Sequence, residues 1–324
     1  MAGHRRLLLA ALGLTTGSLL LAVTVGSVDI PAVEAIGHLF TDDGSVHDRI
    51  IDELRLPRAL TAFAVGGLLA VAGVLMQVLL RNPLADPYVL GVSGGAAGAV
   101  LGAMLLALSA AWLTPAAVVG ALFSTLLVFG MTHASDDWRS DRLLLTGVVV
   151  AAGWAALISF VLSVSPMQQL PGMLFWLMGD LGDATAPGLP LTLLVTAVLL
   201  LSLRARDLNV AAQGMLQAAA LGVDTARLRM ELYFVGATLT AAAVAVGGAI
   251  GFVGLIVPHL VRRVGGTDHR VLIPVAALSG GSLLLLADTA ARTLIRPMQL
   301  PVGVLTALIG VPIFLYLLQR QAAR

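Results

Sequence analysis

The sequence predicts an all-α polytopic membrane protein with about ten transmembrane helices, some of them short or broken. Three observations support this fold class. Of the 324 residues, 58% are hydrophobic and only 11% are charged, whereas a soluble domain carries about 25% charged residues. The chain contains eight long stretches without a charged residue. Glycine and proline interrupt several of these stretches, which favours helices that end or bend at membrane depth.

The basic side chains with permanent charge are all arginine, and neither lysine nor cysteine occurs in the chain. A Walker A loop needs a lysine to reach the β- and γ-phosphates of ATP, and Schiff-base chemistry needs a lysine as its nucleophile. Without cysteine there is no disulfide and no thiolate metal site. We therefore expect any ATP used by this protein to be hydrolysed on another chain. The net charge of +1 indicates no nucleic-acid partner.

The lengths of the charge-free stretches predict the number of spans, because a bilayer core about 30 Å thick needs about 20 helical residues per crossing. The first stretch, 7–28, is longer than the core of a signal peptide and predicts a retained first span. The stretch 87–135 holds 49 residues with Pro115 near its middle, which predicts two helices joined by a turn. The stretch 143–179 predicts one span, a break and a short second piece.

The stretch 232–261 has to leave the cytoplasmic side and return to it within 30 residues, although two full crossings need about 40. The glycines from Gly247 onward and Pro258 predict one full helix, a break and a short helix buried within the protein. The predicted spans are about 7–28, 57–80, 89–110, 115–133, 143–165, 189–203, 231–248, 252–262, 271–291 and 301–319.

The placement of arginine predicts the orientation, because the cytoplasmic ends of membrane spans carry an excess of basic residues. With the N-terminus inside, 14 of the 19 arginines fall on the cytoplasmic side. The outer side receives Arg49, Arg55, Arg58, Arg292 and Arg296 and an acidic first loop. Both termini are therefore predicted to be cytoplasmic. The spans that follow "RLPR" and "RLR" start on opposite sides, which suggests an inverted repeat.

Three segments resemble a known family of membrane proteins. Segment 54–95 contains "RLPR" and "RNPLADPYVLGVSGG", segment 247–296 contains "GFVGLIVPHLVRR" and "ADTAAR", and segment 300–318 reads "LPVGVLTALIGVPIFLYLL". Weaker matches are "FWLMGDLG" at 175–182 and "ALGVDTARLR" at 220–229. Together they resemble the permease subunits of binding-protein-dependent ABC importers for iron-siderophores, haem and vitamin B12. The resemblance extends over nearly the whole chain.

This resemblance implies a type II importer fold, with residues 1–324 forming a single transmembrane permease domain. Such permeases form homodimers with a central translocation path in the bacterial inner membrane. They work with two cytoplasmic ATP-binding subunits and a periplasmic substrate-binding protein. The resemblance therefore implies that this chain is not itself an enzyme and binds no cofactor or metal, because ATP and Mg are held on the ATPase subunits.

The segment 204–230 is the longest polar interruption in the second half of the chain. From the residues alone we predict short helices, with Asp207 or Asn209 capping the first, Gly222 ending it and Asp224 capping the next. An ordinary interfacial loop is the alternative. The resemblance implies that this loop forms the coupling helices that contact the ATPase. It assigns that contact to Asn209, Gln213, Gly214, Leu221, Gly222, Asp224 and Arg227.

The sequence departs from the family pattern at one place in this loop. The family usually has an acidic residue soon after the glycine, whereas Gly214 is followed by Met215, Leu216 and Gln217. This difference leaves the individual contacts with the ATPase open.

Three arginines at the outer ends of spans are candidates for docking the binding protein: Arg55, Arg58 and Arg292. Guanidinium groups facing water can pair bidentately with carboxylates of a partner. In related permeases the arginines of these motifs form salt bridges to acidic residues on the two lobes of the binding protein. The alternative is an arginine that anchors its helix at the lipid headgroups. Arg296 is a further candidate.

Few ionisable residues are expected at membrane depth. Asp86 lies in "NPLADP", where it and Asn82 can bond backbone groups freed by the prolines. We expect His259 to be a packing residue rather than a haem ligand, and His133 to lie at the inner interface. Asp288 lies one helical turn before Arg292 and is expected to orient it.

The substrate path is predicted from span 143–165 and the segment that follows it. Its candidates combine neutral polar groups with soft thioethers: Ser163, Met167, Gln168, Met173 and Met178. A path for a large chelate should hold few strong ligands, and this composition fits that requirement. The alternative is that the methionines only fill gaps in the core.

The sequence therefore predicts the permease of an ATP-driven importer for a bulky iron chelate, either haem or a ferric siderophore. A cobalamin importer of the same family is the first alternative. A secondary transporter driven by an ion gradient is the second, but it would need a carboxylate or a cation relay near the midplane, and the spans hold almost no charge. An intramembrane enzyme would need a metal cluster or a serine with a base, and no span contains such a set.

Overall fold

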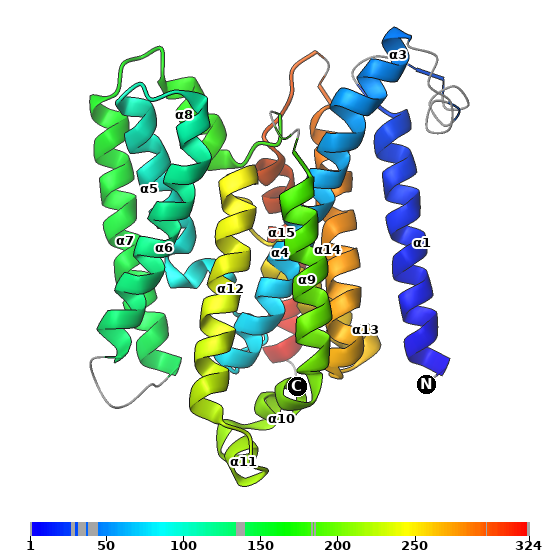
Figure 1. Cartoon of the computed structure of the whole chain (residues 1–324), viewed down its shortest axis with the longest axis vertical. Coiled ribbons are helices and arrows are strands. Elements are labelled where there is room, and N and C mark those ends of the chain that lie inside the picture. The colour runs from blue at the N-terminus through cyan, green and yellow to red at the C-terminus, as the bar shows by residue number, and fades with distance from the viewer. Residues whose placement is uncertain are drawn as a thin grey trace.

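The computed structural model describes residues 2–26, 30–31, 37, 45–133, 140–182, 184, 186–295 and 297–322. Every regular element in these ranges is a helix. Most of the long helices stand side by side along the long axis of the molecule (Figure 1). The all-α prediction is confirmed.

The long helices are α1 (Ala2–Thr24), α4 (Leu56–Leu79), α6 (Leu113–His133), α7 (Ser140–Val164), α9 (Gly188–Leu203), α12 (Thr225–Gly247), α14 (His269–Ala291) and α15 (Val302–Ala322). The shorter helices are α3 (Val46–Arg49), α5 (Val92–Leu105), α8 (Leu170–Met178), α10 (Ala205–Gln213), α11 (Met215–Ala220) and α13 (Val253–Gly265). A π-helical turn, η1 (Ile50–Arg55), leads into α4, and the 3-10 turns η2 (Pro87–Leu90) and η3 (Ala110–Trp112) precede α5 and α6.

Each of the ten predicted spans coincides with one of these helices. Within the described ranges, seven helices are long and apolar enough to cross a membrane, or eight if the bent pair α9 and α10 counts as one span. The difference from ten arises from α5 and α13, which have 14 and 13 residues. A helix of that length covers about two thirds of a bilayer core, so the count of ten is approximate.

The two short helices belong to two units of similar design. In each unit a long helix ends in a break and a short helix follows: α4 leads through η2 to α5, and α12 leads through residues 248–252 to α13. The long helices α4 and α12 start at opposite ends of the bundle (Figure 1), as an inverted repeat requires. The breaks meet where the Tyr88 hydroxyl donates to the Ile250 carbonyl at 2.8 Å and accepts from the Ile250 N–H at 2.9 Å.

Helix α4 forms the centre of the bundle and packs most extensively on α14. Their close approach depends on glycine, because a Cβ on Gly66 would collide with the carbonyl oxygen of Gly280. Gly73 lies in the same way against the carbonyl of Gly254 at the start of α13. Small residues therefore allow the backbones of three helices to meet, which is the packing mode that helices use in membranes.

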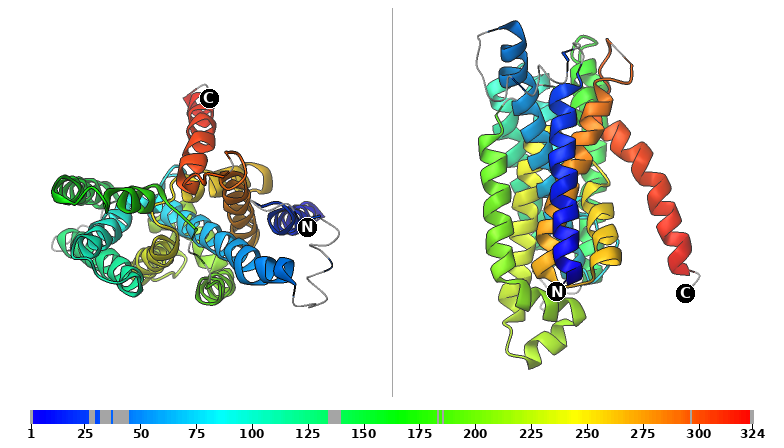
Figure 2. Two further views of the ribbon diagram at one scale, coloured as in Figure 1. Left: turned by 90° about the horizontal axis from the view of Figure 1, so that it is seen from above. Right: turned by 90° about the vertical axis from the view of Figure 1, so that its right-hand side faces the viewer.

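The outer helices present apolar side chains away from the bundle. Examples are Leu9 on α1, Phe123 on α6 and Val149 on α7, all of which are exposed. Such a surface suits acyl chains rather than water. Helix α15 leans away from the other helices toward its C-terminal end (Figure 2). Its side chains Leu315 and Tyr316 are also exposed.

Candidate docking and coupling sites

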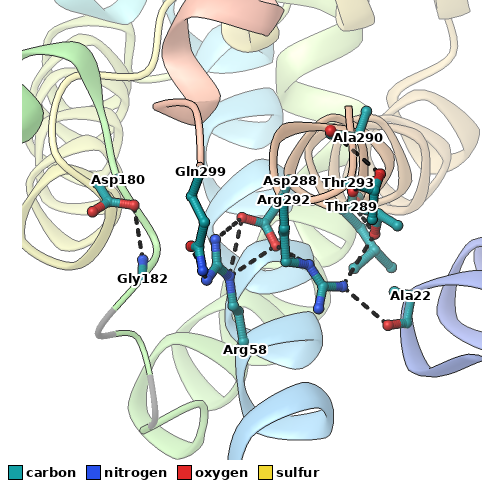
Figure 3. Close-up of polar contacts among 11 residues, drawn as sticks. Ala22, Arg58, Asp180, Gly182, Asp288, Thr289, Ala290, Arg292, Thr293 and Gln299 are labelled. Atoms are coloured by element: carbon teal, nitrogen blue, oxygen red, sulfur yellow. Dashed lines mark hydrogen bonds and ion pairs between the residues drawn. The ribbon is translucent and has the colours of Figure 1, made fainter. Parts of the chain in front are cut away.

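A buried cluster of charges lies at the end of the bundle where α4 begins and α14 ends. Asp288 is 0% exposed, and its Oδ1 accepts hydrogen bonds from Nη2 of Arg58 at 2.8 Å and from Nε of Arg58 at 3.2 Å. Nη1 of Arg58 donates to Oε1 of Gln299 at 3.0 Å. Figure 3 shows the guanidinium of Arg58 lying against the carboxylate of Asp288. This contact ties α4 to α14 and to the segment before α15.

Two further arginines join this cluster and bind the end of α1. Arg292 lies with its Nε 3.4 Å from Oδ2 of Asp288 and donates from Nη2 to the carbonyl of Ala22 at 3.0 Å. Arg55 donates from Nη1 to the carbonyl of Val23 at 2.8 Å. The last carbonyls of a helix have no partner within the helix, so the two arginines supply hydrogen-bond donors to the end of α1.

The expectation that Arg55, Arg58 and Arg292 face water is wrong in this structure, where they are 4%, 9% and 6% exposed. The reason is tertiary: Asp288 and the carbonyls of α1 draw the guanidinium groups inward. The expected contact of Asp288 with Arg292 is confirmed, and its contact with Arg58 was missed. Their role in docking stays a prediction, and Arg296 lies outside the described residues.

Among the described residues, Arg58 and Arg292 share one carboxylate, that of Asp288, so these three side chains carry one positive charge in excess. Arg55 lies near enough to affect the pKa of Arg292. Burial lowers the pKa of Arg292, Asp288 raises it, and the neighbouring Arg58 and Arg55 lower it further. A carboxylate from another protein would compensate this excess. Such an acidic partner is the kind of ligand that the cluster is suited to bind.

The segment 204–230 forms a compact unit at the opposite end of the bundle, below α9 and α12 (Figure 1). We call it the coupling unit. Gly214, with φ of 153°, separates α10 from α11, and Gly222, with φ of 82°, ends α11. Asp224 caps α12, as expected, by accepting from the N–H of Arg227 at 3.0 Å.

The predicted cap of α10 by Asp207 or Asn209 is wrong. The residue at the N-cap position is Arg204, and its side chain makes no capping hydrogen bond. Asp207 instead pairs with Arg204 at 3.3 Å. Arg204 and Arg227 both pair with Glu231 of α12, at 2.8 and 3.0 Å. The Arg204–Glu231 pair joins the start of α10 to α12, whereas the Arg227–Glu231 pair lies within α12. Exposed pairs of this kind contribute little stability.

The predicted coupling residues do not all lie on one surface. Gln213, Leu221, Gly222, Asp224 and Arg227 are exposed, whereas Gly214 is buried. Four of these residues, Leu221, Gly222, Asp224 and Arg227, line a cavity of about 350 Å³. Arg204, Arg206 and Asp207 contribute further charged side chains to its lining.

Two residues of the coupling unit behave differently from the expectation. Asn209 turns inward: its Nδ2 donates to Oδ1 of Asp268 at 2.9 Å, and its Oδ1 accepts from the N–H of His269 at 2.8 Å. This contact lowers the pKa of Asp268, as do the N–H and the charge of Arg270. Leu216, which was not predicted, is 89% exposed on α11. The signal for it in the sequence was an apolar residue within a polar loop.

The predicted path residues lie at the end of α7, in the turn that follows it and in α8, near the end of the bundle that carries the arginine cluster (Figure 1). Ser163, Met167, Gln168 and Met178 are exposed. Met173 is fully buried and packs with Leu101 and Val161 in a small apolar cluster. It therefore fills a gap between α5, α7 and α8 and faces no open path in this structure. For the other four residues, lining the path stays a prediction.

The other residues that were expected at or near membrane depth serve the structure of the fold where the structure describes them. Asp86 accepts from the N–H of Tyr88 at 2.8 Å, and Asn82 accepts from the N–H of Leu84 at 2.9 Å, so both cap the broken segment as expected. His259 is buried in α13. The side chain of His133 lies outside the described residues. Among the residues described, no three His, Asp or Glu gather into a group that could hold a metal ion.

Comparison with known proteins decides the family. A profile of the FecCD transport family matches residues 14–320, almost the whole chain. The chain belongs to the FecCD transport family. It is 44% identical over 281 residues to the cobalamin import system permease BtuC of Halobacterium salinarum, covering 85% of this chain and 74% of that protein. It is 41% identical over 319 residues to the hemin transport system permease HmuU of Yersinia pestis, covering 94% and 93%.

A solved structure shows the same fold. An inward-facing structure of a metal-chelate type ABC transporter matches with a TM-score of 0.86 and 31% identity, covering 98% of this chain and 99% of that one. This FecCD chain is therefore a multi-span permease of an ABC importer. The family implies a place in the inner membrane and partners that supply ATP hydrolysis and substrate binding. The relatives are named for different cargoes, so the family leaves the substrate open.

Proposed function

We propose that two copies of this FecCD chain form the membrane path of an importer that carries a bulky iron chelate, haem or a ferric siderophore, by alternating access. Two ATPase subunits dock on the coupling unit, and a periplasmic binding protein docks at the arginine cluster. The chain itself binds no cofactor. Cobalamin is the second candidate substrate, because the relative with 44% identity is named for it.

One observation carries this proposal: the coupling unit and the arginine cluster lie at opposite ends of one bundle (Figure 1). The N-terminus of α1 and the C-terminal end of α15 lie at the end that carries the coupling unit. In this orientation, with the coupling unit in the cytoplasm, both termini are cytoplasmic. The positive excess at the other end then faces the periplasm, where an acidic binding protein can reach it.

The homodimer is supported by the position of α15. Helix α15 leans away from the bundle (Figure 2), and its apolar side chains Leu308, Val311 and Leu315 are exposed. A second copy would cover them and enclose a path between the two chains. Cross-linking of single cysteines placed along α15 tests this arrangement, since the natural chain has none.

The decisive experiment is transport by the assembled importer in proteoliposomes. The chain is co-expressed with its ATPase subunit and binding protein, and uptake of haem, a ferric siderophore and cobalamin is compared side by side. We expect uptake to require ATP, to be blocked by vanadate and to favour an iron compound. Uptake that continues without ATP and collapses with an uncoupler would refute the proposal.

Docking is tested separately by the affinity of the binding protein for the permease. Arg55→Gln removes one charge of the cluster and should weaken this affinity by at least about tenfold. Arg49→Gln is the matched control, because Arg49 is exposed at the same end outside the cluster. Equal affinities for the two variants would count against the docking role.

A further inference from the structure

The inward turn of Asn209 is unusual for a residue of a docking surface. Both the nitrogen and the oxygen of its amide contact the start of α14. Nδ2 donates to Asp268, and Oδ1 lies 2.8 Å from the backbone nitrogen and 2.6 Å from Nδ1 of His269. Asp268 is also the N-cap of α14 and accepts from the N–H of Arg270. One side chain of the coupling unit therefore holds the first turn of α14.

The other end of α14 carries the arginine cluster. Asp288 and Arg292 follow about five helical turns later, and the 23 residues of the helix extend about 34 Å. Along this length α14 packs on α4, with Gly66 and Gly280 in backbone contact. A helix packed this closely transmits displacement rather than absorbing it, because packed cores have discrete arrangements.

Helix α4 makes a similar connection between the two ends. Arg58 binds Asp288 near its start. Arg81 follows its end, and Nη2 of Arg81 lies close to Gly214 at the junction of α10 and α11. Helices α4 and α14 thus form a pair, which we call the strut, that touches the arginine cluster at one end and the coupling unit at the other.

Buried polar groups without a hydrogen-bond partner lie near the contact between Asn209 and α14. In the described part of the chain, Nε and Nη2 of Arg262 and Nε2 of His269 are buried without a hydrogen-bond partner. Unsatisfied buried polar groups are rare in native structures. A second arrangement of the coupling unit could satisfy them, so this junction has a physical reason to exist in two states.

We infer that Asn209 is a positioning residue that fastens the coupling unit to the strut, so that docking of the binding protein at the arginine cluster changes the ATPase at the other end. The inference rests on the proposed function. It assigns to Asn209 an intramolecular task rather than a contact with the ATPase. The groups that make this contact are the amide of Asn209, Asp268 and His269.

The test measures how strongly the binding protein stimulates vanadate-sensitive ATPase activity of the assembled importer. For Asn209→Ala we expect stimulation to fall at least about fivefold, the lower end of typical coupling between sites, with basal activity and assembly retained. Arg6→Ala is the control, because Arg6 is an exposed polar residue near the N-terminus of α1, at the same end of the molecule. Stimulation of Asn209→Ala equal to that of the wild type overturns the inference.

Two further variants separate positioning from simple stabilisation. Asn209→Asp keeps the oxygen that faces His269 but places a second negative charge beside Asp268. Stimulation of the ATPase should therefore fall, and this variant can be measured even if Asn209→Ala assembles poorly with the ATPase. Unchanged stimulation overturns the inference. Combining Asn209→Ala with Asp288→Asn should give no further loss, because both changes cut one connection; independent effects would multiply and overturn it. If the wild type neither assembles with an ATPase nor responds to a binding protein, the proposed function itself fails.

Discussion

Replacing Asp288 with asparagine tests the charge balance of the arginine cluster most directly. Asparagine keeps the volume of the side chain but removes the negative charge that Arg58 and Arg292 share at 2.8 and 3.4 Å. Asp288 is 0% exposed, so water cannot take over its contacts with the two guanidinium groups. Removing one member of a buried ion pair costs about 3 to 5 kcal/mol, because the remaining charge is left uncompensated. We expect Asp288→Asn to lose about that much stability.

The assay is reversible unfolding of the full chain in mixed micelles, followed by the fluorescence of its tryptophans. Asp52→Asn is the matched control, because Asp52 is an exposed carboxylate at the same end of the bundle, and it should change stability by less than about 0.5 kcal/mol. Adding Arg58→Gln to Asp288→Asn should recover part of the loss, since it removes an unpaired charge. A loss of less than about 1 kcal/mol for Asp288→Asn would refute the reasoning.

Three further predictions concern the backbone contacts and the Asp268 carboxyl. Gly73→Ala should abolish the yield of monodisperse protein, because its Cβ would collide with an opposing carbonyl, whereas Gly102→Ala should be neutral because a Cβ there meets no atom within 4 Å. Tyr88→Phe loses two hydrogen bonds between the broken segments and should lower stability by about 1 to 3 kcal/mol in the same unfolding assay. The pKa of Asp268 is lowered chiefly by Asn209, so the stability gap between wild type and Asn209→Ala should be full at pH 7 and shrink as the pH falls below about 3.8. A gap that is constant from pH 7 to pH 3 would contradict this linkage.

The helices could be predicted because their signal is local. Charge-free length, glycine and proline decide where a helix can lie in lipid, since every backbone polar group must be satisfied within the helix. The break after Gly247 and the division of 87–135 into two helices were predicted in this way and are confirmed, although the turn between α5 and α6 precedes Pro115, which lies in the first turn of α6. The caps by Asp86 and Asp224 were also predictable, because a cap involves residues two or three positions apart.

The sites could be predicted only in part. Asp288 and Arg292 lie four residues apart, so their contact follows from helical spacing. The contact of Asp288 with Arg58 joins residues 230 positions apart, and spacing carries no information about it. Asn209 was assigned to the coupling surface by family pattern, yet its amide faces α14. Met173 was assigned to a path and fills the core instead.

The sequence by itself determined the class of protein, the positions of the spans and the family, because composition, charge-free length and motifs are properties of the chain. Only the tertiary structure decided which charges meet. Burial at helix ends removes water from Arg55, Arg58 and Arg292, so their partners must come from whichever helices pack beside them, here α1 and α14. The same packing placed the coupling unit and the arginine cluster at the two ends of α4 and α14. A connection between distant sites is a property of the packed helices, and the order of residues along the chain does not contain it.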